Sequence, residues 1–468
     1  MNKNRKIKTN RKRRNLFLAA AVSVSIAAAL AGCGTNQTAQ VETANVQAVE
    51  DTSAVSESIA ETASVSSVSS GTEAITATAN VTSGGLLDAA DFFTERDLMQ
   101  TADVSEAVSY TVEDGKTISI KEEGVYVLSG SASNAQIIIE AEDTAKVQLV
   151  LDGVSVTNDS LPCIYVKSAD KVFITTTDSE NSLAVTGVFN ADGETNTDAV
   201  IYSKDDLVLN GVGTLSISSS DNAVSSKDDL KVTGGTYVVS CSGTAFEAND
   251  SLLISGGSFQ VANCNDGLHA ENDEDNTLGY VYICGGTFEI NAADDAIHGT
   301  TIVQIDDGTF DLTAAEGIEA TQIQINGGKL SISASDDGIN GSQKSTAYEV
   351  LVEFNGGDST IVMGAGDTDA VDSNGNLYVN GGTLTISGQS AFDFDGTGQK
   401  NGGTIIVNGQ EINELTNQFM GGGGMQGGPG MGGMRQGGPG MNQENFGGEM
   451  PQGGQGTNPF GNGSDTLY

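Results

Sequence analysis

Residues 281–340 consist of three successive units: VYICGGTFEINAADDAIHGT, TIVQIDDGTFDLTAAEGIEA and TQIQINGGKLSISASDDGIN. Each unit has a Gly-Gly or Asp-Gly pair near its start and an acidic residue before a small one near its end. Such pairs recur along the chain in steps of 20 to 29 residues, beginning at Gly234, Gly256, Gly285, Asp307, Gly327, Gly356, Gly381 and Gly402. A period of this size is the signature of a solenoid.

Each unit holds three short runs with strand character. One precedes the glycine pair, as in Leu377 to Asn380, a second follows it, as in Phe288 to Asn291, and a third begins at an acid, as in Asp295 to His298. Period-2 runs of four or five residues bounded by Gly and Asp turns are strands, and no window holds a helical period. Three strands per turn of roughly 22 residues predict an all-β fold, a parallel β-helix.

Alignment of the units produces columns of like residues. Two positions before the glycine pair the residues are apolar, and the column reads Val232, Ile254, Ile283, Ile305, Ile325, Phe354 and Val379. Two positions after it stand Tyr237, Phe259, Phe288 and Phe310, and directly before it stand Asn326, Asn355 and Asn380. We therefore expect an inward apolar column, an aromatic stack and an amide ladder, all of which require coils in register.

The N-terminal segment has the features of an export signal. Its first fourteen residues carry eight of the 21 Lys and Arg, an apolar run follows from Leu16 to Ala31, and Leu30-Ala31-Gly32-Cys33 resembles the lipobox of bacterial lipoproteins. We predict a signal peptide at 1–32, lipidation of Cys33, and export to the outer face of the cell membrane. The alternatives are an ordinary signal peptide or an uncleaved anchor.

Removal of that leader leaves a strongly acidic chain. The remaining residues comprise 13 basic and 62 acidic side chains, a net charge of −49. Nucleic acid is excluded as a partner by this charge, which leaves a solvated surface or a cation-binding protein.

Composition divides the rest of the chain. Residues 33–103 are the lipidated Cys and a Ser/Thr/Ala-rich linker, in which Leu86 to Met99 is either a short helix or more linker, and 104–410 are the β-helix. Residues 411–468 form a Gly/Met/Gln-rich tail, expected to be disordered like most of the linker. Cys241 and Cys264 fall at nearly equivalent positions of neighbouring coils, and theirs is the disulfide worth testing.

Acidic columns mark the corner that opens the third strand. The predicted Ca²⁺ ligands are Asp266, Asp294, Asp295, Glu316, Asp336, Asp337, Asp369 and Asp372. Equivalent residues of stacked coils lie about 4.8 Å apart, and carboxylates that close repel one another unless a cation lies between them. Ca²⁺ prefers such oxygen-rich clusters. The alternative is that each acid only forms a turn.

A second ladder lies three residues further on, at Glu247, His269, His298 and Glu319. Its histidines are the only two in the chain. Side by side they could bind Zn²⁺ or another borderline metal, although outward-facing histidines in a polar stripe explain them as well. The chain has no Trp, so Tyr282 and Tyr378, expected to face outward, are the candidates for stacking on sugar rings, unless they are ordinary strand residues.

The features that carry a resemblance to a known family are the Asp-Gly-Ile and Asp-Ala-Val corners, the Gly-Gly-Thr turns, the run Val147 to Thr157 and the leader. In these features the sequence resembles the clostridial-type carbohydrate-binding lipoproteins related to pectate lyases. The resemblance covers about 104 to 410. It implies a right-handed parallel β-helix, Ca²⁺ at acidic coil corners, and binding of plant cell-wall polysaccharide such as cellulose and pectic acid.

We expect no enzyme activity. A related lyase would abstract a proton with Lys or Arg beside Ca²⁺, but residues 104–410 contain no Arg, and the candidate bases Lys204 and Lys227 each precede two acids. A Ca²⁺-dependent lyase is the first alternative. A non-enzymatic adhesin or structural stalk is the second.

Overall fold

The computed structural model describes residues 85–366 and 368–417. The signal peptide, Cys33, most of the linker and most of the tail lie outside these residues, and what we expect of them stays a prediction. Within the described residues, no helix is long and apolar enough to cross a membrane.

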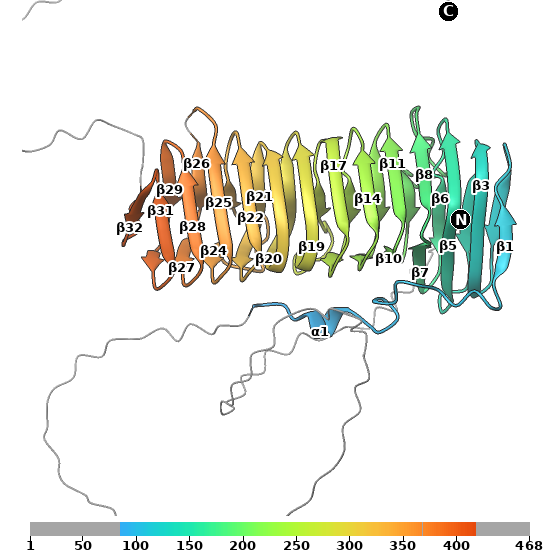
Figure 1. The fold of residues 1–468 in the computed structure, drawn as a ribbon, viewed down its shortest axis with the longest axis horizontal. Helices are drawn as coiled ribbons and strands as arrows, with labels where there is room; N and C mark the ends of the chain where they lie inside the picture. The colour runs from blue at the N-terminus through green and yellow to red at the C-terminus, as the bar shows by residue number, and fades with distance from the viewer. Residues whose placement is uncertain (1–84, 367, 418–468) are drawn as a thin grey trace, which may run out of the picture. The chain divides into compact units, whose positions relative to one another are not determined.

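Three parallel ladders of strands make up the fold, and the coils follow one another in chain order (Figure 1). Ladder A contains β1 (Val108–Thr111), β3 (Gly124–Ser133), β5 (Lys146–Asn158), β7 (Lys171–Thr176), β10 (Asp206–Gly211), β13 (Asp229–Val232), β16 (Ser251–Ile254), β19 (Tyr280–Ala292), β20 (Asp295–Ala314), β21 (Glu316–Ile325), β24 (Leu351–Phe354), β27 (Asn376–Val379) and β30 (Gly398–Lys400).

Ladder B begins with the second halves of β3 and β5, includes those of β19 and β20, and adds β8 (Glu180–Val185), β11 (Thr214–Ser219), β14 (Thr236–Ser240), β17 (Ser258–Cys264), β22 (Lys329–Ala334), β25 (Asp358–Met363), β28 (Thr383–Ser387) and β31 (Thr404–Val407). Its last strand is capped by β32 (Gln410–Ile412), which pairs antiparallel.

Ladder C includes the starts of β20 and β21, together with β2 (Thr117–Ile120), β4 (Gln136–Glu140), β6 (Ile164–Ser168), β9 (Ala199–Ser203), β12 (Asn222–Ser226), β15 (Phe246–Ala248), β18 (Leu268–Ala270), β23 (Ile339–Gly341), β26 (Asp369–Ser373) and β29 (Ser390–Phe394). The predicted all-β stack of parallel strands is confirmed. The right-handed sense implied by the resemblance stays a prediction.

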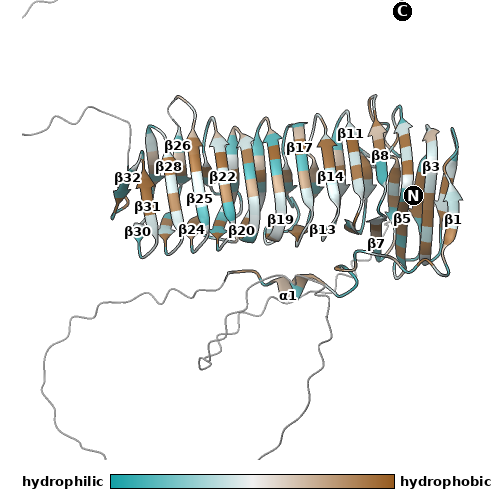
Figure 2. Cartoon of the chain, viewed as in Figure 1, coloured by the Kyte–Doolittle hydropathy of each residue, from teal (hydrophilic) through white to brown (hydrophobic). Residues whose placement is uncertain are grey.

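Like residues stack on like inside the coils, because successive coils pair in register. Phe259, Phe288 and Phe310 are buried, with ring centroids 4.6 and 4.5 Å apart in nearly parallel planes. Burial of each ring contributes about 1.5–3 kcal/mol. Figure 2 shows hydrophobic and hydrophilic bands alternating along the strands, as expected for strands that bury one of their two faces. The predicted aromatic stack is confirmed.

The amide ladder forms beside the glycine pairs. Asn355 donates to the side-chain oxygen of Asn326 over 2.8 Å, and Asn380 donates to that of Asn355 over 2.7 Å. The chain turns here through Gly357, whose φ of +73° only glycine adopts readily. The Gly-Gly pair therefore marks a turn whose positive φ favours glycine.

Cys241 and Cys264, the pair singled out for testing from the sequence, form a disulfide, and Cys163 is a buried free thiol.

A segment that we call the strap, residues 86–100, lies along the outside of ladder A (Figure 1). Only Ala89–Phe92 of it is helical (α1), far less than the possible helix from Leu86 to Met99. The backbone N–H of Leu87 donates to Gln304 Oε1 over 2.8 Å, and Gln100 Nε2 donates to the carbonyl of Thr233 over 3.1 Å. The last part of the predicted linker therefore belongs to the folded unit.

Candidate functional site

Ladder C presents its acids and histidines on the outside of the coils, in two columns. The first contains Asp266, Asp295, Glu316, Asp337 and Asp369, and the second contains Glu247, His269, His298, Glu319, Asn340, Asp372 and Asp393. Each member of the second column pairs with the next across parallel strands. The register therefore brings residues of adjacent coils within reach of one another.

Charge is compensated where the histidines lie. The rings of His269 and His298 stack with centroids 4.5 Å apart, and His298 Nδ1 lies 2.9 Å from Asp295 Oδ2. His269 lies 3.4 Å from Asp266 and 3.6 Å from Glu271. Burial alone would lower the pKa of His269, but these two carboxylates raise it to about 9. The two imidazoles are thus held as counter-ions to buried acids.

Glu319 is the most fully satisfied of these acids. Its Oε1 accepts from Asn340 over 3.1 Å, from Ser342 over 2.9 Å and from Lys344 over 2.8 Å, while its Oε2 lies 3.2 Å from His298 Nδ1. Burial would raise the pKa of Glu319, but His298 and Lys344 lower it to about 2. Lys344 and Glu271 were not among the sequence candidates.

Asp295, His298 and Glu319 bring one ligand atom each within 4.8 Å of the others, and no other such group occurs among the described residues. An oxygen, nitrogen, oxygen set suits Zn²⁺ or another borderline metal. However, Lys344 already neutralises Glu319, and His298 already bridges both carboxylates. Asp295, His298 and Glu319 therefore already form a network of ion pairs with Lys344.

The C-terminal part of the two columns differs in its charge balance. Within the described chain, Glu316, Asp337 and Asp372 make no ion pair with Lys, Arg or His. Burial, followed by repulsion from neighbouring carboxylates, raises the pKa of Asp337 to about 6 and that of Asp372 to about 7. Burial and nearby acids raise the pKa of Glu316 to about 7, against a hydrogen bond from Asn340. Among the described residues these three carboxylates thus have no ion-pair partner in contact, and only Glu316 feels the charge of Lys344 from further away.

Asn340 links the two parts. Its Nδ2 donates to Glu316 over 3.0 Å as well as to Glu319, whereas its Oδ1 is buried without a hydrogen-bond partner. An unpartnered buried oxygen beside uncompensated carboxylates is a natural additional ligand for a hard cation. Glu316, Asp337, Asp369, Asp372 and Asn340 thus lie at neighbouring positions of the two columns, although in the described residues no three of these acids bring ligand atoms within 4.8 Å of one another.

Asp294 and Asp336 are exposed at the turns that lead into ladder C, each one residue before a member of the first column. Their backbone N–H groups donate to the preceding coil, Asp294 to Asn265 over 2.9 Å and Asp336 to Ala315 over 2.9 Å. The Oδ1 of Asp337 likewise accepts from the N–H of Asp369 over 3.1 Å. Several predicted ligands therefore also support the turns, as the alternative interpretation proposed.

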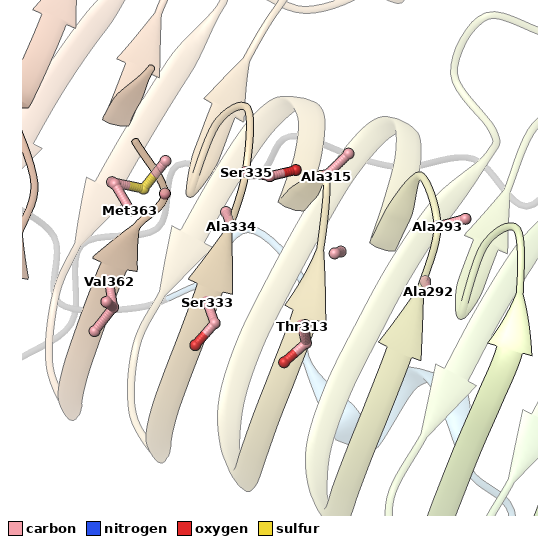
Figure 3. A pocket seen from close by; sticks show the side chains of 11 residues that line it. Ala292, Ala293, Thr313, Ala315, Ser333, Ala334, Ser335, Val362 and Met363 are labelled. Carbon is pink, nitrogen blue, oxygen red and sulfur yellow. The ribbon is translucent and has the colours of Figure 1, made fainter. Parts of the chain in front are cut away.

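A shallow hollow of about 420 Å³ lies at the corner between ladders B and C (Figure 3). It is lined mainly by small side chains, including Ala292, Ala315 and Ser335, with Met363 at one end. Asp294, Glu316 and Asp336 directly follow lining residues in the chain. The hollow therefore borders the acidic columns.

A model of the family described as "Carbohydrate-binding domain-containing protein" matches residues 114–370, more than half of the 468 residues. The chain belongs to this family. Over 124 residues it is 36% identical to a carbohydrate-binding domain-containing protein of Acetivibrio thermocellus, an alignment that covers 26% of this chain and 43% of that protein. The chain thus spans less than half the length of that relative.

A solved structure of a polysaccharide lyase-like protein from C. thermocellum, a gadolinium derivative, matches 67% of this chain and 97% of its own. The identity is 20% and the TM-score is 0.30, values too low to support a conclusion about the site.

Of the two tyrosines predicted to stack on sugar rings, Tyr282 is covered and Tyr378 stays a candidate. Tyr282 is only 1% exposed, because Phe92 of the strap packs 5.3 Å from its ring and its hydroxyl donates to Asp306 over 2.6 Å. The prediction that it faces the solvent is wrong. The apolar pair Phe92-Phe93 was the signal that residues of the linker cover this face. Tyr378 is half-buried on β27.

The two candidate lyase bases are both engaged. Lys227 Nζ lies 2.8 Å from Glu247 Oε1, and Lys204 Nζ donates to Thr195 over 2.9 Å. The Lys227 amine is thus already paired with an acid of the second column, and the Lys204 amine with a threonine hydroxyl.

Proposed function

We propose that this member of the carbohydrate-binding family is a cell-surface protein that binds plant cell-wall type polysaccharide, cellulose and/or pectic acid, with Ca²⁺ held at the acidic corners of ladder C. The family match supports the carbohydrate part of the proposal. The observation that carries the Ca²⁺ part is the set of half-buried carboxylates at Glu316, Asp337 and Asp372, which make no ion pair within the described residues.

The residues that would hold the cation are Glu316, Asp337, Asp369 and Asp372, with Asn340 Oδ1 as a neutral ligand. Ca²⁺ takes six to eight oxygens, so solvent or sugar oxygens would complete the shell. When bound, Ca²⁺ supplies positive charge that can attract the carboxylate of an acidic sugar. The protein's own contribution is to fix these oxygens on rigid, in-register strands.

Charge predicts different requirements for the two classes of polysaccharide. A mature chain of net charge −49 repels pectic acid, so pectate must be bridged by Ca²⁺, whereas a neutral glucan binds by hydrogen bonds and apolar contact. We expect retention on insoluble cellulose to survive EGTA and retention on pectate to be lost. Co-sedimentation with each polymer, with and without Ca²⁺, measures this.

The same assay separates the alternatives. A rise in ultraviolet absorbance from unsaturated product, removed by Lys204→Ala or Lys227→Ala, would make the protein a lyase. Failure to retain either polymer in Ca²⁺ would leave the adhesin or stalk. Under the proposed function, both polymers are retained and no absorbance appears.

We further propose that lipidation of Cys33 anchors the protein to the outer face of the membrane. Cys33→Ala cells are expected to release or misprocess the protein, because the thioether that holds the lipid cannot form. Fractionation of cells followed by electrophoresis measures this, with Thr35→Ala as the matched control. Unchanged mobility of the Cys33→Ala protein in the membrane fraction would contradict the lipoprotein assignment.

A further inference from the structure

The outer face of ladder B carries a hollow larger than the one at the corner. In the described chain, the strap lies along part of ladder A, and ladder C carries the charged columns. Ladder B instead has a groove of about 720 Å³ that crosses six coils, from β8 to β20. An elongated ligand could therefore contact this face without displacing another part of the described structure.

The groove follows the register of the strands. One row of its lining residues pairs in succession across parallel strands: Ser182, Ser216, Val238, Gln260, Glu289 and Asp311. At about 4.8 Å per step, the row is about 24 Å long. Equivalent groups thus repeat at a regular interval along one line, which matches a polymer better than a compact ligand.

The chemistry of the lining favours a neutral polymer. Serine hydroxyls and the amides of Gln260 and Asn291 can each donate and accept, as sugar hydroxyls do, and in the described structure these two amides bond to no other protein group. No Lys, Arg or His lines the groove, whereas Glu289 and Asp311 do. A polyanion would therefore be repelled here.

The groove and the corner hollow share Thr313. The open path consequently continues along ladder B toward the turns that carry Glu316 and Asp336. A neutral chain and a Ca²⁺-bridged acidic chain would thus contact adjoining but different faces.

We propose that a single neutral polysaccharide chain of the β-glucan class lies lengthwise in the ladder B groove, bound by its hydroxyl and amide side chains. This inference rests on the proposed function, since that function supplies the polysaccharide. It adds the binding face and assigns neutral and acidic polymers to separate surfaces.

Ala262→Arg tests the groove with the full chain. Ala262 is exposed at the centre of the groove, so a long side chain there fills the path without entering the core. We expect retention on insoluble cellulose to weaken by about tenfold, while Ca²⁺-dependent retention on pectate stays as in wild type. Ser218→Arg changes another exposed groove position, and we expect the same loss of cellulose retention from it. Agreement between the two variants shows that the loss does not come from misfolding of one of them.

Ser387→Arg is the matched control. Ser387 is exposed in the same column of ladder B but lies outside the groove and the corner hollow, and we expect wild-type retention from it. Wild-type retention by both groove variants, or an equal loss in Ser387→Arg, would overturn the inference. If wild type itself retains no polymer, the proposed function fails instead. Unchanged circular dichroism and melting establish that each variant is folded.

Discussion

Millimolar Ca²⁺ is expected to raise the melting temperature of the β-helix, and Asp337→Asn combined with Asp372→Asn to abolish that rise. A ligand that binds only the folded state at a hundredfold excess over its Kd adds about 2.7 kcal/mol. For a unit of this size, that corresponds to roughly 5 °C. Scanning calorimetry in EGTA and in Ca²⁺ measures the difference for each variant.

Asp358→Asn is the control for loss of charge. Asp358 is exposed at the start of β25 in ladder B, so its replacement removes a negative charge from another face. The Ca²⁺-induced rise should be retained in this variant. Identical melting of wild type in EGTA and in Ca²⁺ would leave the acids as turn formers. Loss of the effect in Asp358→Asn would point to unspecific screening.

The pH dependence has opposite signs in the two conditions. In EGTA, Glu316, Asp337 and Asp372 have pKa values raised to about 6 or 7, above those of unfolded chains. Their stabilising effect as neutral acids is complete below the unfolded values near 4 and is lost as pH rises through 6 to 7. Ca²⁺ binds the ionised forms, so its effect should instead grow over that window.

The repeated motifs were sufficient to predict the fold, because every aligned column of residues indicates the same in-register stacking of the coils. Val232 and Ile254, or Phe288 and Phe310, are equivalent only if the coils are in register, and the strand pairing places them so. The strap was harder to predict. It contains no strand period, and its position depends on contacts such as Asp97 with Lys231, which no local pattern encodes.

The site was predictable in part for the same reason. The acidic columns follow from the alignment of the units, but their charge balance does not. Lys344, which neutralises Glu319, comes from residues between β23 and β24 that interrupt the period, so its reach could not be deduced from the register. Tyr282 was assigned the correct side of its strand, but the strap that covers that side was missed.

Asp97→Ala is expected to release the strap and to destabilise the protein by about 3–5 kcal/mol. The Asp97 side chain is fully buried, and its carboxylate lies 3.5 Å from Lys171 Nζ and 3.7 Å from Lys231 Nζ. Its removal takes a counter-charge from both amines, of which that of Lys231 is almost fully buried. Asp206 lies 3.4 Å from Lys171 and can still neutralise that amine directly, but it does not pair directly with Lys231.

Arg96 makes the release measurable, because no other Arg lies between Arg14 and Arg435. The Arg96 guanidinium packs over the ring of Phe173, with 4.4 Å to the centroid, so an arginine-specific protease should cut there only when the strap opens. We expect rapid cleavage after Arg96 in Asp97→Ala and slow cleavage in wild type and in Asp91→Ala, which replaces an exposed acid of the same segment. Equal cleavage rates in all three proteins would contradict the role of Asp97. Rapid cleavage with unchanged urea unfolding would instead mean that the strap is held by Asp97 but adds little to the stability of the coils.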